Sequence, residues 1–101
     1  MMKSIKVRTT LKNGSVTVRM FVRHPMHVGG PRKNGDSYAP HFIQEISCQL
    51  NGEIVMQGHW GPGIAENPYL SFIVDNAKVG DALAFRWSDN QGGTDVFETK
   101  L

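Results

Sequence analysis

The sequence has only one cysteine, no long apolar run and no apolar segment near its start. With Cys48 alone, the chain cannot form an internal disulfide or a multi-cysteine metal site. Its longest apolar stretches, such as residues 70–74, are far shorter than the roughly 20 residues of a membrane-spanning helix. The first ten residues lack the apolar segment of a secretory signal. We therefore expect no membrane contact, and we expect another chain to carry any export signal.

The composition is that of an ordinary folded protein, with 40% hydrophobic and 20% charged residues among 101. A chain of this length has room for one hydrophobic core. No useful stretch repeats its apolar residues at the helical period of 3.6. We therefore predict one domain over residues 1–101, built from strands.

The charges are divided unevenly along the chain. Residues 1–33 contain eight Lys or Arg and no carboxylate, whereas residues 34–101 contain three basic and nine acidic residues. A basic arm of this kind is one route to nucleic-acid binding. Here the basic residues alternate with apolar ones, and no stacking aromatics accompany them. This pattern favours solvated strand faces, and we expect no nucleic-acid partner.

The dominant pattern is a period of two residues. Within residues 16–23 every even position is apolar and most odd positions are polar, which is typical of a strand with one face on a core. Asn13-Gly14 and Asn51-Gly52 are turn signals of β-hairpins. Seven strands are predicted in this way, over residues 4–8, 16–23, 42–50, 53–57, 69–75, 82–88 and 94–100. This favours an all-β, antiparallel sandwich of immunoglobulin-like or fibronectin-like type.

The alternation also predicts which side chains face the core. In the third strand Phe42, Ile46, Cys48 and Leu50 share one face, so Cys48 should be a buried thiol and not a nucleophile. In the fifth strand Leu70, Phe72 and Val74 continue the core face. Tyr69, Ser71 and Ile73 then face outward.

Two segments do not read as strands. Residues 24–40 form a predicted loop of 17 residues, a length that is usually functional or disordered. Residues 59–68 form the other, with Trp60 among glycines and prolines.

The histidines raise an alternative function. His24, Met26 and His27 lie close together, His41 and His59 could approach from other loops, and imidazole with thioether suits copper. Pro25 stiffens the segment, however, and no carboxylate is close in sequence to orient a ligand. We expect no metal and no cofactor, and we keep a small periplasmic copper or redox protein as the alternative.

Four short motifs resemble the SoxZ family, whose members are subunits of the SoxYZ thiosulfate-oxidation carrier. They are His24-Pro25-Met26 with Gly29 after it, Cys48-Gln49-Leu50-Asn51-Gly52, Asn67-Pro68-Tyr69-Leu70-Ser71-Phe72, and Trp87-Ser88-Asp89 followed by Gly92. Their order and spacing cover nearly the whole chain.

The resemblance implies an immunoglobulin-like, non-catalytic periplasmic subunit that pairs with SoxY as a heterodimer and, through that complex, meets other sulfur-oxidation enzymes. In such complexes SoxY carries sulfur intermediates on a cysteine of its mobile tail, and SoxZ has no redox group. The resemblance also implies export as a folded complex with a partner that holds the signal, for which the twin-arginine route is suited.

The partner interface is predicted from residues that a sandwich does not obviously need. An outward Tyr69 and Ile73, with Met26 and Trp60 nearby, would form an apolar patch that a monomer rarely leaves uncovered. We also expect the isolated chain to be able to self-associate. The alternative is that Met26, Trp60 and Tyr69 cap the open ends of the sandwich. The predicted partner-binding set is Arg23, His24, Met26, Arg32, Trp60, Asn67, Pro68, Tyr69 and Ile73.

Overall fold

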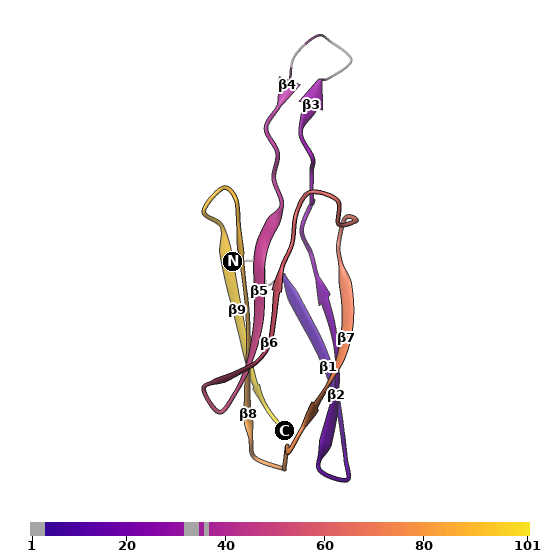
Figure 1. Cartoon of the computed structure of the whole chain (residues 1–101), viewed down its shortest axis with the longest axis vertical. Helices are drawn as coiled ribbons and strands as arrows, with labels where there is room; N and C mark the ends of the chain where they lie inside the picture. The colour runs from indigo at the N-terminus through magenta and orange to yellow at the C-terminus, as the bar shows by residue number, and fades with distance from the viewer. Residues whose placement is uncertain (1–3, 32–34, 36) are drawn as a thin grey trace.

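A computed structural model describes residues 4–31, 35 and 37–101 of the chain. The described residues form strands, turns and bends, with no helix (Figure 1). None of them forms a helix long and apolar enough to cross a membrane. The strands are β1 (Ile5–Lys12), β2 (Ser15–Val22), β3 (Gly30–Pro31), β4 (Ser37–Tyr38), β5 (Ile43–Leu50), β6 (Glu53–His59), β7 (Tyr69–Asp75), β8 (Ala82–Asp89) and β9 (Thr94–Lys100).

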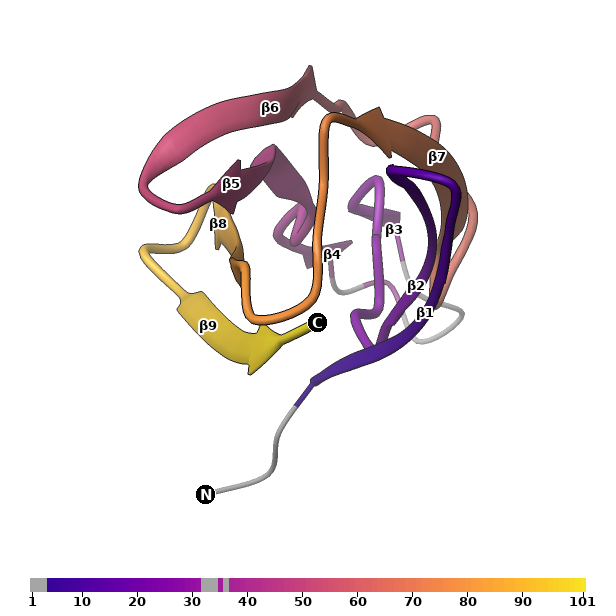
Figure 2. The same ribbon diagram turned by 90° about the horizontal axis from the view of Figure 1, so that it is seen from below.

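The seven long strands make two antiparallel sheets that face each other. One has the order β1-β2-β7 and the other the order β6-β5-β8-β9. Figure 2 shows the two sheets as opposite walls around a common interior. The predicted all-β sandwich with seven main strands is therefore confirmed.

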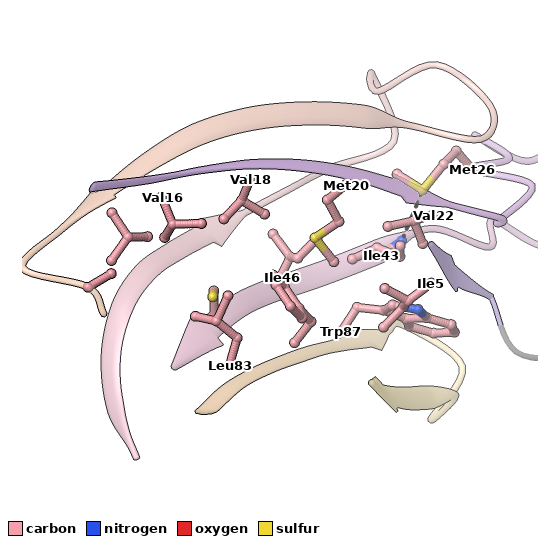
Figure 3. Close-up of a cluster of buried hydrophobic side chains, with 14 residues drawn as sticks. Ile5, Val16, Val18, Met20, Val22, Met26, Ile43, Ile46, Leu83 and Trp87 are labelled. Carbon is pink, nitrogen blue, oxygen red and sulfur yellow. Dashed lines mark hydrogen bonds between the residues drawn. The ribbon is translucent and has the colours of Figure 1, made fainter. Parts of the chain in front are cut away.

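The core is filled by inward side chains from both sheets (Figure 3). Val16, Val18 and Met20 of β2 are fully buried, as the alternation predicts. Cys48 of β5 is also fully buried, and this desolvation raises the pKa of its thiol to about 11. The buried assignment of Cys48 is confirmed, and the thiol is protonated at neutral pH.

The segment predicted as a 17-residue loop is partly regular. β3 pairs with β4, and an isolated bridge joins His27 to His41, with both backbone N–H···O=C bonds formed. Figure 1 shows this segment as a long hairpin that extends β2 and β5 beyond the sandwich. The prediction of an irregular loop was wrong because strands of two residues leave no alternation to detect.

Phe42 is partly buried and packs against the core as predicted, but the alternation missed Ile43 beside it. Ile43 is fully buried, whereas Phe42 is only partly buried and lies before β5. The pairing of β5 with β8 shifts between Ile43 and Glu45, as at a β-bulge. The shift lets Ile43 and Ile46 point inward together, which a strict period of two does not allow.

Candidate functional site

The outer face of the β1-β2-β7 sheet exposes a pair of aromatic rings. Phe21 lies opposite Tyr69 in the register of β2 and β7, and their ring centroids are 4.7 Å apart. Phe21 is 46% exposed and Tyr69 51% exposed. Ile73 continues the same face of β7 and is 67% exposed. This is an apolar patch at the surface, and we call Phe21, Tyr69 and Ile73 the aromatic patch.

Basic side chains surround the aromatic patch. Lys6 lies opposite Phe21, and Arg8 lies opposite Arg19, all of them exposed on the outer face. Like charges in directly opposed positions destabilise a sheet. Asp75 is the one carboxylate among the strand residues of this sheet, and it accepts a hydrogen bond from Ser15 Oγ at 2.8 Å. The face is therefore positively charged.

Four of the predicted partner-binding residues belong to this surface. Tyr69 and Ile73 lie on the aromatic patch as the alternation predicts. Arg23 and Asn67 are exposed and line a hollow of about 260 Å³ together with Lys6 and Phe21. Arg32 lies outside the described residues. Phe21 was missed, although it is the apolar exception among the odd positions of its strand.

The other predicted residues do not join the patch. His24, Met26 and Pro68 are buried, and the backbone N–H of Ile43 donates to Met26 Sδ at 3.3 Å (Figure 3). Asn67, although it lines the hollow beside Phe21, also binds to this end, because its Oδ1 accepts from the backbone N–H of His24 at 3.1 Å. These residues organise the end of the sandwich from which the hairpin extends.

Trp60 is also separate from the aromatic patch. It is partly buried and packs against the core. A Cβ added at Gly58 would lie 3.4 Å from Trp60 Nε1 and 3.2 Å from Ile46 Cγ2, so the absent side chain makes room for the indole. The expected cluster of Met26 and Trp60 with Tyr69 is therefore not formed, and the capping alternative describes Met26 and Trp60 but not Tyr69.

A buried cluster of two histidines and one aspartate lies at that same end. His24 Nε2 is 3.0 Å and His41 Nε2 2.9 Å from the same oxygen, Asp89 Oδ2. The side chains of His24 and Asp89 are each 2% exposed, and that of His41 is 32% exposed. The expectation that no carboxylate would orient these histidines was wrong, because Asp89 is far away in sequence but adjacent in the fold.

The Asp89 carboxylate is fully occupied by hydrogen bonds. Its Oδ1 accepts from the backbone N–H groups of Gln91 and Gly93, at 3.0 and 2.7 Å. Burial acts to raise the pKa of Asp89, but the hydrogen bonds from His24, Gly93, His41 and Gln91 together lower it to about 2. Asp89 is therefore ionised at neutral pH.

The hydrogen bonds also assign the tautomer of His24. The backbone N–H of Met26 donates to His24 Nδ1 at 3.1 Å, so Nδ1 carries no proton. The ring proton is then on Nε2 and points to Asp89. The donor atoms of His24, His41 and Asp89 lie within 4.8 Å of one another, but in this tautomer His24 Nε2 has no lone pair for a metal. Through these hydrogen bonds the cluster joins the segment after β2, the segment before β5, and β8.

Among the described residues of the copper alternative, His24 and His41 meet at Asp89, whereas His27, His59 and the sulfur of Met26 do not join them. His59 is exposed on β6, and His27 is exposed at the bridge to His41. The sulfur of Met26 faces the backbone of β5 in the core. The geometry gives this alternative no support.

Comparison with known protein families identifies the family of the chain. The comparison with curated proteins gave no match. The family model described as sulphur oxidation protein SoxZ matches residues 5–100. The chain therefore belongs to the SoxZ family and is a subunit of a sulfur-oxidation (Sox) system.

Proposed function

We propose that this chain is the non-catalytic subunit of a SoxYZ sulfur carrier complex. It pairs with a SoxY-type chain that carries covalent sulfur intermediates, and it stabilises that chain. The observation that carries the proposal is the aromatic patch, since interfaces favour aromatic anchors and a monomer rarely leaves such residues uncovered.

The chemistry of the described residues supports a binding role. The Cys48 thiol is buried with a pKa of about 11, so it is not available as a nucleophile. The Asp89 carboxylate is saturated by hydrogen bonds and holds the backbone of the β8–β9 turn. These groups stabilise the sandwich.

Co-expression with a SoxY-type chain tests the proposal. The expected result is a stable complex that elutes as a heterodimer on a sizing column and in which this chain carries no covalent sulfur. Failure of the two chains to associate at micromolar concentrations would contradict it.

We propose further that the complex works in the periplasm and that a signal-bearing partner exports it. Cell fractionation should recover the chain in the periplasm when the partner retains its signal. The same chain should stay in the cytoplasm when that signal is deleted.

A further inference from the structure

The free edge of β1 combines an unpaired strand with a basic and apolar groove. β1 is the terminal strand of its sheet, paired only with β2. The backbone N–H of Arg23 donates to the Ser4 carbonyl at 2.7 Å, which makes this a hydrogen-bonded pair. Such pairs alternate along an antiparallel ladder, so Lys6, Arg8 and Thr10 also direct their backbone groups to β2. The N–H and C=O groups of Val7 and Thr9 therefore point to the open edge, whereas those of Ile5 lie at its covered start, with Ile5 only 3% exposed.

The opposite sheet covers only the start of this edge. Ser4 N and Oγ donate to Asp95 Oδ2 at 2.9 and 2.7 Å, and Trp87 Nε1 donates to Ser4 Oγ at 2.8 Å. Beyond Ser4 a groove of about 620 Å³ follows β1, on the side where Figure 2 shows β9. Its lining is Ile5, Lys6, Val7, Arg8, Phe21 and Phe97.

The lining defines the chemistry of an occupant. Four apolar side chains line the groove together with Lys6 and Arg8, and no carboxylate does. Neither cation forms an ion pair with any described residue. An extended segment with alternating apolar and acidic side chains would match both the groove and the charges.

We propose that the free edge of β1 binds such an extended acidic segment as an added antiparallel or parallel strand. The backbone groups of Val7 and Thr9 supply the hydrogen bonds, as in other strand-addition complexes. Lys6 and Arg8 select acidic side chains. The inference rests on the proposed function in one respect, namely that the segment belongs to the SoxY-type partner.

A proline at the open edge tests the added strand directly. Thr9 is exposed and its N–H points away from β2, so Thr9→Pro removes one donor of the added ladder and keeps the β1–β2 bonds. The matched control is Thr9→Ala, which keeps the N–H. We expect Thr9→Pro to weaken binding of the partner by roughly tenfold or more at an unchanged melting temperature, and Thr9→Ala to bind normally.

Charge reversal tests the selection of acidic side chains. The probe is a fluorescent peptide of about eight residues with alternating Glu and Val, measured by anisotropy at low salt. Wild type should bind it, and Lys6→Glu with Arg8→Glu should bind at least roughly tenfold more weakly. Arg86→Glu on the other sheet should bind like wild type, and a Lys and Val peptide should not bind. Should Thr9→Pro fail to fold, this pair of variants decides the proposal.

The outcomes distinguish failure of the groove proposal from failure of the proposed pairing with a SoxY-type chain. If the SoxY-type chain binds Thr9→Pro and wild type equally, strand addition is wrong while pairing stands. If the partner never binds wild type, the proposed function fails, and the acidic peptide still decides the chemistry of the groove. If that peptide binds wild type and the charge-reversed variant equally, or neither of them, the groove proposal is overturned and the cations only protect an edge strand.

Discussion

The two sheets share one core but have different outer faces. The β1-β2-β7 face carries the aromatic patch beside Lys6, Arg8 and Arg19. The β6-β5-β8-β9 sheet also exposes apolar side chains, but it carries both signs of charge, with Glu45 and Arg86 lining one hollow. In both sheets the inward side chains must pack against the shared core. The outward positions differ in their aromatic pair and in the sign of their charges, and on this ground we propose the β1-β2-β7 sheet as the side that meets a partner.

The largest expected effect comes from breaking the core that both faces share. Cys48→Asp places an unpaired carboxylate at a fully buried position, at a cost on the order of 4 kcal/mol or more. Urea unfolding should show this loss of stability. Because both outer faces depend on the same core, they should be lost when the variant unfolds. Cys48→Ala is the control and should keep partner binding nearly intact. Rapid reaction of native Cys48 with a thiol reagent would contradict the buried assignment.

The next effect concerns the buried cluster of His24, His41 and Asp89 and not an outer face. The pKa of Asp89 in the folded protein, about 2, lies below its ordinary value of 3.8, so ionised Asp89 stabilises the fold by about 2 kcal/mol above pH 3.8. It should be lost as pH falls from about 5 to 2. Asp89→Asn should be less stable at pH 7 and less sensitive to acid in urea unfolding at several pH values. An unchanged acid sensitivity in Asp89→Asn would show that other carboxylates govern it.

Alanine substitutions on the two outer faces sharpen the comparison. Tyr69→Ala and Phe21→Ala should each weaken pairing with a SoxY-type chain by roughly 1–3 kcal/mol, the range of interface anchors. Val96→Ala is the control, because Val96 is equally exposed, at 51%, on the other sheet. Titration calorimetry with melting curves distinguishes the outcomes. Normal pairing by both variants would place the interface elsewhere.

Trp60→Ala tests a residue that the structure reassigns. Because Trp60 packs against the core, we expect roughly 1–3 kcal/mol of lost stability and little change in partner affinity once the variant is folded. The same calorimetry and melting curves measure both quantities. A loss of affinity without a change in melting temperature would return Trp60 to the interface.

The smallest expected effect concerns single exposed charges. Arg19→Glu on the basic face should reduce the association rate with the partner by a few fold, and raised salt should reduce the difference from wild type. Arg86→Glu should change the rate little. Equal effects of the two substitutions would mean that the charge difference between the faces does not guide association.

The strands and their faces could be read from the sequence because the signal is local. The alternation of β2 and β7 places Val16 and Val74 inside and Tyr69 and Ile73 outside without any knowledge of the partner strand. The same reasoning missed the burial of Ile43, where a bulge changes the phase. It also failed for the hairpin beyond His27, whose strands of two residues are too short to show an alternation of apolar and polar residues.

The sequence alone determined the sandwich class, the burial of Cys48 and the outward position of Tyr69, since each depends on neighbours within a few residues. The tertiary structure decided which distant groups meet. Asp89 bonds His24 and His41 across 65 and 48 residues of chain. Met26 turned into the core and Trp60 against Gly58, away from the aromatic patch. Such contacts depend on register, bulges and the docking of the two sheets, which no local period encodes.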